Sequence, residues 1–516
     1  MVSRPHMLRT SAVVGIFSFL GSLTGILVEI SIAARLGLSR SSDTFYAAFT
    51  IPYIITNFLK AAGQFSLVPF FSALDTRHAP EDLWRGFSYT FNVLFLGMGS
   101  LAALGALTAP WLIRGLAPGF THSETVAASE LCRLLFLMLV PAGVAEAIRS
   151  FLLSQHRFAV PASGSFFRNL TVIAAILFTF RRFGLYSLVW GYIAGYLVQL
   201  AILGAQLAAS FPVRYSLTLA GSGEAFLNLR HAATAQLGAG VGSELRIVAE
   251  RMIASFLPPG TLTALAYGLK LMTTLAEILS GSVGTAVLPA LSRAFAHGNS
   301  EEAHRAFRHA VEIALALAFP AAVFCLMLPH HIIRLVFERG HFTPQMAALM
   351  ARIFFCYSFS LLLYVGMRML YFYLFAKNEP AAYLRLATLQ QGWTIALDLL
   401  FAGVCHWTVA GIPLAMLTSL LGAAAFATWQ NFGGFIEALG NKFSVYFLKV
   451  LAGAALAALV VWGLGAALPA PQSGFANFIF LCETCGAGIV AFFATLLLLR
   501  AFKLSQIASL WGQAEG

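Results

Sequence analysis

Charged residues are scarce in this chain. Only 10% of its 516 residues are Asp, Glu, Lys or Arg, whereas 59% are hydrophobic, and the mean hydropathy is +0.81. In a soluble globular protein about a quarter of the residues are charged. The composition therefore excludes an ordinary soluble enzyme. Because the sequence also offers no convincing nucleotide-binding loop or Ser-His-Asp set, we expect no enzymatic activity.

Cysteine is also rare. The six cysteines are scattered, and the closest pair is Cys482-Glu-Thr-Cys485. A zinc or redox site would need further cysteine or histidine ligands nearby, and none follows this pair. We interpret the two cysteines as small packing residues, with a redox or zinc role as the alternative. The sequence thus predicts neither a resident cofactor nor a metal centre.

Long apolar runs are what the sequence has in abundance. Runs of about 20 residues recur from Thr10 to the region after Gly474, and each could cross a hydrocarbon layer of about 30 Å as a helix. Barrel strands, the other way to satisfy backbone groups in lipid, would be shorter and alternate between polar and apolar residues. The sequence therefore predicts an all-α polytopic membrane protein with about fourteen transmembrane helices.

The lysines and arginines behind the formal net charge of +11 are distributed unevenly among the predicted loops. Lysine and arginine are far more numerous in segments on the side of the N-terminus than in those on the opposite side. By the positive-inside rule, this asymmetry places both termini in the cytoplasm. The charge therefore indicates membrane topology, and we expect no nucleic-acid partner.

The sequence repeats weakly. Pro69 and Pro289 occur in similar strings, as do Arg114 and Arg334, and both pairs are 220 residues apart. Six predicted spans fit into one period, so both copies enter the membrane in the same orientation, as in transporters with parallel repeats. This predicts a six-helix lobe over residues 1–210, a cytoplasmic linker over 211–229, a second six-helix lobe over 230–436, and two additional transmembrane helices with a tail over 437–516.

The few charges inside apolar runs are the candidate functional residues. A charge at mid-bilayer costs at least about 2.5–3.5 kcal/mol, so it seldom persists without a partner or a role. Lys60 and Lys270 occupy corresponding spans of the two lobes and are suited to bind an anionic headgroup. The alternative is that each forms an internal ion pair or reaches the interface. Charges such as Arg168 and the Glu146/Arg149 pair are expected to be span-end charges or interhelical pairs.

Three acidic positions remain open to two readings. Glu29 could pair with a lysine or bind a proton or cation, or it could be a neutral, hydrogen-bonded acid. Thr394 and Asp398 are four residues apart, so their oxygens share a helix face and could point at one ion. The alternative for Glu250 and Asp398 is a structural pair with Arg251 and Arg368, respectively.

Several strings resemble the MurJ/MviN family, the lipid II flippases of the MOP transporter superfamily. The resemblance rests on Ser42–Phe49, Ser154–Pro161, Gly284–Phe295 and Phe337–Thr343, among others, and covers most of the chain. It implies fourteen helices, two lobes around a V-shaped central cavity, and alternating access for a lipid-linked pyrophosphate glycan.

The resemblance also implies site residues. Substrate-binding residues would be Lys60, Lys270, Glu29, Asp43 and Arg251. A coupling cation, sodium or a proton, would bind at Glu250, Thr394 and Asp398, where Thr394 replaces the family's asparagine. Both arginines of the family's first helix are missing from Ser22–Glu29, and the arginine of its eighth helix is replaced by Lys270. Lysine point charges are not equivalent to bidentate arginines.

These features together predict a MurJ-like flippase that moves lipid II or a similar polyprenyl-pyrophosphate-linked precursor for peptidoglycan synthesis. We expect it in the bacterial inner membrane, among membrane lipids and with cell-wall synthesis proteins as further partners. Two alternatives remain open: a cation-coupled exporter of drugs or metabolites from the same superfamily, and a membrane scaffold that transports nothing.

Overall fold

The computed structural model describes residues 4–77, 80–219, 221, 224–405, 407–440, 442–469, 471 and 473–501. Over these residues the chain is helical and contains no strand, which confirms the all-α prediction. The chain divides into two compact units. Unit 1 comprises Met1–Thr263 and Arg339–Phe342, and unit 2 comprises Ala264–Glu338 and Thr343–Gly516.

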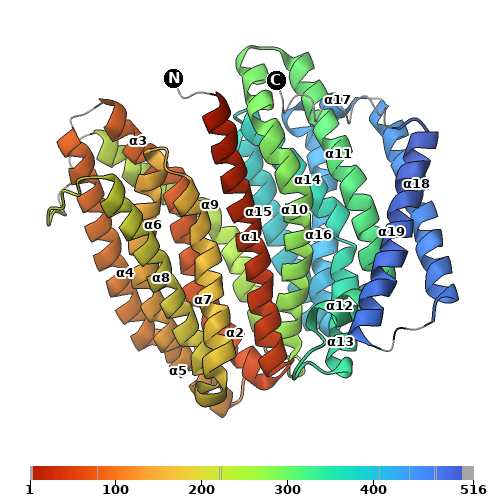
Figure 1. Cartoon of the computed structure of the whole chain (residues 1–516), viewed down its shortest axis with the longest axis horizontal. Helices are drawn as coiled ribbons and strands as arrows, with labels where there is room; N and C mark the ends of the chain where they lie inside the picture. Colours follow the sequence, from red (N-terminus) through yellow and green to blue (C-terminus); the bar gives the residue numbers. More distant parts are fainter. Residues whose placement is uncertain are drawn as a thin grey trace. The chain divides into compact units, whose positions relative to one another are not determined.

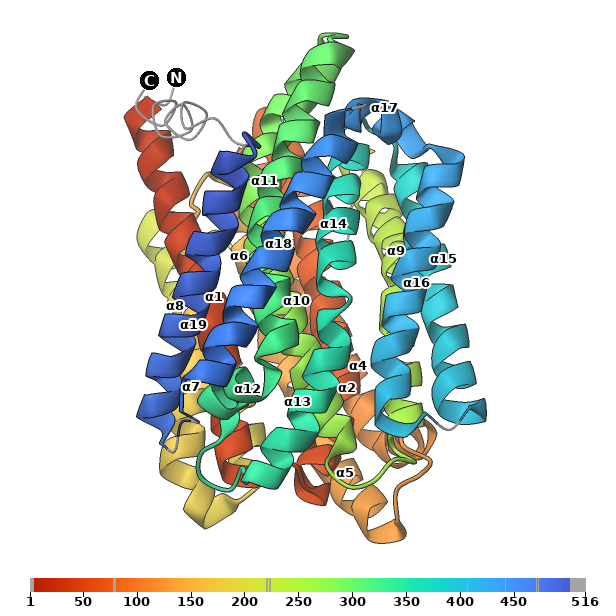
Figure 2. The same ribbon diagram turned by 90° about the vertical axis from the view of Figure 1, so that its right-hand side faces the viewer.

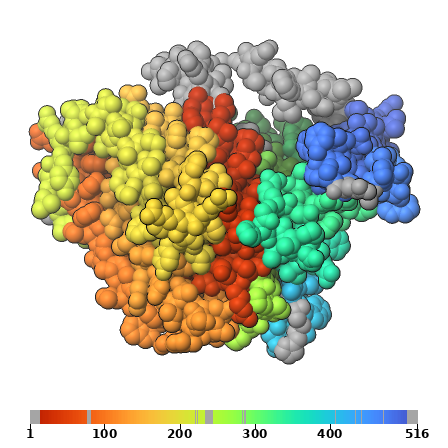
Figure 3. All heavy atoms as spheres, turned by 60° about the horizontal axis from the view of Figure 1, so that its bottom comes forward, coloured from red at the N-terminus to blue at the C-terminus, as the bar shows by residue number. Residues whose placement is uncertain are grey.

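Unit 1 is a bundle in which α4, α6 and α8 lie side by side (Figure 1). Helix α5 packs against α8, and Figure 3 shows the surface of these segments. Its elements in chain order are α1 (Arg4–Leu36), α2 (Arg40–Ala62), the π-helix η1 (Gly63–Leu67), α3 (Val68–Arg77), α4 (Pro80–Leu116), α5 (His122–Leu135), the 3-10 helix η2 (Phe136–Met138), α6 (Leu139–Ser154), α7 (Ala159–Phe183), α8 (Tyr186–Ser210) and α9 (Glu224–Ala254).

In unit 2, α18 packs between α11 and α19 (Figure 2). The first residues of α10 belong to unit 1 and the rest to unit 2. The elements are α10 (Thr261–Ala296), α11 (Ser300–Met327), α12 (Pro329–Phe337), α13 (Pro344–Ser358), α14 (Leu361–Ala376), α15 (Pro380–Asp398), the π-helix η3 (Leu399–Val404), α16 (Thr408–Gln430), the 3-10 helix η4 (Phe432–Gly434), α17 (Phe435–Leu439), α18 (Lys442–Ala467) and α19 (Gly474–Leu498).

The described residues contain enough long apolar helices for a multi-pass membrane protein. Among the described residues, ten helices are long and apolar enough to cross a membrane, and α13 with α14 makes an eleventh across a 45° bend. Helices α2, α9 and α15 are not among these ten. The multi-pass architecture is thus confirmed, whereas the number fourteen stays a prediction.

The boundary between the compact units differs from the predicted linker. Helix α9 belongs to unit 1, and the unit boundary falls at residues 263 and 264. The lobes at 1–210 and 230–436 were predicted from the sequence repeat. The compact units do not test that repeat, so the lobes stay a prediction. Residues 211–219 of the predicted linker contain no helix, whereas its last residues, 224–229, begin α9. Asn92 of α4 anchors residues 211–219 by donating to the carbonyl oxygens of Ser216 and Thr218 over 3.2 and 2.9 Å.

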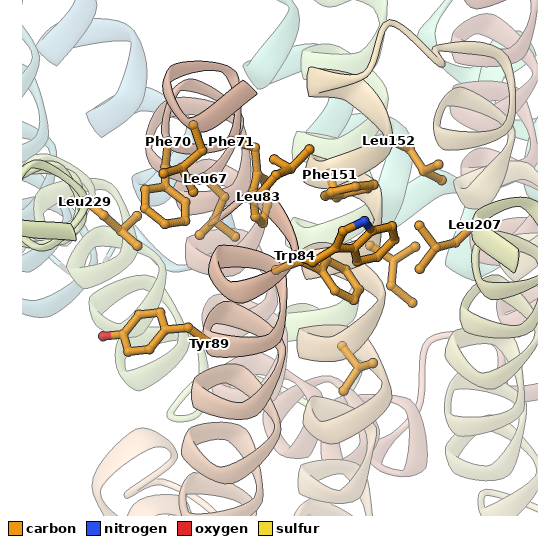
Figure 4. Packing of buried hydrophobic residues seen from close by; sticks show 14 of the residues in the cluster. Leu67, Phe70, Phe71, Leu83, Trp84, Tyr89, Phe151, Leu152, Leu207 and Leu229 are labelled. Atoms are coloured by element: carbon orange, nitrogen blue, oxygen red, sulfur yellow. The ribbon is translucent and has the colours of Figure 1, made fainter. Parts of the chain in front are cut away.

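An aromatic core holds α4 and α6 together in unit 1. Phe151 of α6 lies 5.3 Å from Trp84 and 5.1 Å from Phe87 of α4, ring centre to ring centre. The ring centre of Phe71 of α3 lies 5.5 Å from that of Phe151. Figure 4 shows Phe71, Trp84 and Phe151 with aliphatic neighbours such as Leu152. Such tilted and edge-on pairs contribute about 0.5–1.5 kcal/mol each beyond burial of their area. They hold α3 and α4 against α6, the helix that carries Glu146 and Arg149.

Two π-helical segments interrupt these helices, and each lies next to a predicted site residue. The segment η1 begins three residues after Lys60, and η3 begins directly after Asp398. A π-helix inserts an extra residue into the turn and redirects the side chains around it, and such segments are frequent at functional sites.

Candidate functional site

A group of polar side chains meets within the apolar helices of unit 1. We call Thr56, Lys60, Arg168, Tyr196 and Gln199 the Tyr196 cluster. Tyr196 is only 6% exposed; its hydroxyl is hydrogen-bonded to Thr56 and lies within range of the charge of Lys60. The guanidinium carbon of Arg168 lies 5.0 Å from the centre of the Tyr196 ring. The cluster therefore joins α2, α7 and α8 around one buried phenol.

The local sequence explains why these groups meet. Thr56 and Lys60 are one turn apart on α2, as are Tyr196 and Gln199 on α8, so each pair shares a face. Gly195 lets α8 approach α7 closely, because a Cβ there would lie 2.9 Å from the backbone oxygen of Arg168. The side chain of Lys60 remains exposed. The structure thus places the predicted residue Lys60 near polar side chains. The sequence around Lys60 indicates Thr56 as a neighbour but not Tyr196, which belongs to another helix.

A buried ion pair lies beside this cluster. Arg149 donates to both carboxylate oxygens of Glu146 at 2.8–3.0 Å, and the charge of Lys60 also acts on Glu146. Gly63, the first residue of η1, packs directly against that carboxylate: an added Cβ would lie 2.6 Å from the Glu146 Cδ. Glu146 and Arg149 form a pair, as expected, but within one helix rather than between two.

Glu29 of α1 is hydrogen-bonded. The Tyr46 hydroxyl of α2 donates to the Glu29 carboxylate, and the charge of Glu29 also acts on the half-buried Tyr192 of α8. Of the readings offered for Glu29, the structure provides the hydrogen-bonding partner. Its role in substrate binding stays a prediction.

Asp43 connects parts of the chain that are far apart in sequence. Its carboxylate, 6% exposed, accepts bonds from the Gly260 N–H at 2.6 Å, the Thr263 N–H at 2.9 Å and the Thr263 hydroxyl at 2.6 Å. These backbone donors belong to the start of α10, where N–H groups have no partner within their own helix. Asp43 thus caps α10 from α2. Arg251 lies within range of its charge and donates to the Leu262 carbonyl at 3.1 Å.

Glu250 forms an ion pair with Arg246, one turn earlier on α9. The pair with Arg251 that the sequence offered as an alternative is not among the ion pairs of the described residues. A carboxylate beside an arginine is less free to act as a cation ligand. Its predicted role in a cation site stays a prediction.

Thr394 and Asp398 lie buried in unit 2, and Asp398 is 0% exposed. The Thr394 hydroxyl is bonded to the Ser419 hydroxyl at 2.7 Å. Arg368, the partner suggested for Asp398, instead lies 3.6 Å from the Glu277 carboxylate. In the described parts of the chain, no group of three or more His, Cys, Asp or Glu residues is arranged to hold a metal ion.

Lys270 lies on α10 in unit 2, and its side chain is exposed. No carboxylate of the described residues forms an ion pair with it. Thr273, on the next turn, donates its hydroxyl to the Lys270 carbonyl at 3.3 Å. Within unit 2 the exposed ammonium group of Lys270 could therefore meet an anion, and its role in substrate binding stays a prediction.

Sequence reasoning gave too little weight to Arg168 and Tyr196. Arg168 was expected to be a span-end charge or to pair with another helix, yet it lies in the first half of α7 with neutral partners. The available signal was its spacing: no acid stands three or four residues away on either side. Tyr196 had no signal of its own among the fourteen tyrosines of the chain.

Comparisons with known proteins agree with this architecture. The family model described as "Lipid II flippase MurJ" matches residues 32–480. A probable lipid II flippase MurJ of Rhizobium meliloti is 27% identical over 433 residues, which are 81% of this chain and 77% of that protein. The lipid II flippase MurJ of Burkholderia cenocepacia is 26% identical over 362 residues, 67% of this chain and 69% of that protein.

Solved structures support the fold. A lipid II flippase MurJ in an inward closed conformation matches with a TM-score of 0.77 at 18% identity, covering 94% of this chain and 98% of that one. An inward-facing multidrug resistance MATE family transporter of the MOP superfamily matches with a TM-score of 0.68 at 13% identity, covering 82% and 96%. At these identities, the likeness concerns the fold alone.

Proposed function

Because the chain belongs to the lipid II flippase MurJ family, we propose that it moves lipid II or a closely similar polyprenyl-pyrophosphate-linked glycan from the cytoplasmic to the outer leaflet of the inner membrane. Transport follows alternating access and needs no covalent chemistry by the protein. The observation that carries the proposal is the Tyr196 cluster, which places the cations Lys60 and Arg168 beside a buried phenol within otherwise apolar helices.

Charged headgroups must lose water to cross the bilayer, so their carrier has to replace that hydration. Lys60 and Lys270 are long, exposed ammonium groups that can donate to phosphate oxygens. Glu29 with Tyr46 offers hydroxyl and carboxylate groups to the sugar. Asp43 and Arg251, which shape the start of α10, support the substrate site in this proposal by fixing the helix that carries Lys270.

Cation coupling is a further part of the proposal. Glu250, Thr394 and Asp398 offer oxygen ligands, which suit sodium or a proton. A cation that binds one of two conformations better shifts the population toward it. Asp398 is the residue on which this depends most, because it is fully buried and directly precedes the π-helix η3.

The protein's setting follows from the same proposal. It is a multi-pass protein of the bacterial inner membrane, with both termini in the cytoplasm and membrane lipids around its apolar helices. It supplies peptidoglycan synthesis, so enzymes of cell-wall assembly are its expected protein partners.

The test is complementation of a bacterial strain depleted of its lipid II flippase, with Lys270→Ala and Lys270→Arg in parallel. The wild-type protein and Lys270→Arg are expected to restore growth, and Lys270→Ala to restore it poorly, because only the first two retain a cation. Failure of the wild-type chain despite normal membrane insertion would exclude lipid II. Growth with Lys270→Ala but not with Asp398→Asn would instead show that transport depends on the proposed cation site and not on the charge of Lys270.

A further inference from the structure

Arg168 differs from two other arginines of unit 1, Arg149 and Arg246. Arg149 and Arg246 each bind a carboxylate on their own helix. The groups near Arg168 are neutral: the Gln199 carbonyl oxygen at 3.5 Å, the Asn169 carbonyl oxygen at 3.4 Å and the Tyr196 ring. Within the described residues, no carboxylate lies within ion-pair distance of Arg168. Its positive charge is therefore not cancelled by a direct partner.

An arginine in this position is costly to keep. A charge in the middle of a membrane helix costs at least about 2.5–3.5 kcal/mol, and two hydrogen bonds at the upper limit of length recover little of that. Their geometry nevertheless orients the guanidinium. Asn169 is itself fixed, because its amide donates to the Gly21 carbonyl at 3.1 Å and to the Thr24 hydroxyl at 3.3 Å on α1. The arginine is thus positioned but not neutralised.

A second cation lies within electrostatic range of the same phenol. Lys60 of α2 and Arg168 of α7 both act on Tyr196. Glu146, which Arg149 binds, also lies within range of the charge of Lys60. Arginine presents a planar fork that can hold two phosphate oxygens at once, whereas lysine acts as a point charge. Together they fit an anion that carries two adjacent charged groups.

We propose that Arg168 and Lys60, arranged around Tyr196, form the pyrophosphate subsite of this transporter. Arg168 grips one phosphate with its fork and Lys60 neutralises the other. The subsite rests on the proposed function, and it supplies from α7 the bidentate arginine that α1 of this chain lacks. Tyr196 and Gln199 act as positioning residues, because they hold the guanidinium through its face and one nitrogen.

The test measures binding of lipid II to the purified full-length protein by native mass spectrometry, with Arg168→Ala, Arg168→Lys and Arg35→Ala. Arg35 is the matched control, because it also lies over a ring of α7, Phe180 at 6.0 Å, and donates to a carbonyl of α7 at 3.4 Å. We expect Arg168→Ala to weaken binding by about tenfold or more, as for loss of a charged hydrogen bond. Arg168→Lys should fall between it and the wild type, and Arg35→Ala should stay within about twofold.

Binding of two further ligands distinguishes recognition of the pyrophosphate from a general affinity for lipids. Undecaprenyl pyrophosphate should lose as much affinity as lipid II in Arg168→Ala, whereas uncharged undecaprenol should lose none. Wild-type affinity for the pyrophosphate in both Arg168 variants would overturn the subsite while leaving the flippase function intact. No binding of lipid II to the wild-type protein would overturn the proposed function itself. Arg168→Lys keeps the charge, so it reports on the fork even if Arg168→Ala does not fold.

Discussion

The cap that Asp43 places on α10 leads to a quantitative prediction about stability. Asp43→Ala removes the acceptor of three hydrogen bonds and leaves the N–H groups of Gly260 and Thr263 without it. Thr263 is 0% exposed and Gly260 is buried, so water cannot easily replace the carboxylate. Gly260, at φ +84°, also packs tightly against the backbone of Leu38, which limits how far the turn can relax.

The magnitude follows from these contacts. Leaving a buried donor unsatisfied costs about 1–3 kcal/mol, and losing a helix cap costs about 0.5–2 kcal/mol. For two backbone donors we expect Asp43→Ala to lower the free energy of unfolding by about 3–5 kcal/mol. Asp43→Asn retains the oxygen that accepts from Thr263 but turns an amide N–H toward Gly260. It should therefore lose about half of that amount.

The assay is unfolding of the purified protein by SDS in mixed micelles, which reports the free energy of unfolding. Asp82→Asn is the control, because Asp82 is an exposed acid of α4 whose nearest cation, Arg85, is 3.7 Å away; exposed pairs contribute about 0–1 kcal/mol. An Asp43→Ala protein as stable as the control would refute the capping role. Weakened lipid II binding by a stable Asp43→Asn protein would instead support direct substrate contact.

Two other contacts predict measurable effects. Gly63→Ala should destabilise the protein by about 1–3 kcal/mol in the same SDS assay, as overpacking does, because the new methyl group displaces the Glu146 carboxylate. The control is Gly97→Ala, where a new methyl group would meet nothing within 4 Å and should not destabilise the protein. Equal effects of the two substitutions would contradict this reasoning. Asn92→Ala should release residues 211–219 from α4. Trypsin should then cleave after Arg214 about tenfold faster, as for loss of roughly 1.4 kcal/mol of bonding, and an unchanged rate would show that the side chain does not anchor the linker.

The helices of this protein could be predicted because a long apolar run in a membrane has few alternatives to a helix. Their interruptions could not. The sequences of Gly63–Leu67 and Leu399–Val404 do not predict a π-helix. An extra residue in a turn is accommodated by packing against neighbouring helices, which a local sequence does not reveal. Contacts such as Asp43 to Gly260, 217 residues apart, depend on the fold and leave no local pattern.

The cations within the apolar helices show which features of the candidate site could be predicted from the sequence and which could not. Arg149 follows Glu146 by three residues, so its partner can be read from helical spacing, and the structure contains that pair. Lys270 and Arg168 have no acid three or four residues away, and neither forms an ion pair among the described residues. Arg368 also lacks such an acid, yet it meets Glu277 of another helix. The absence of an acid three or four residues away therefore selects cations that could bind a substrate. Only the contacts between helices show which of these cations have no ion pair in the folded protein.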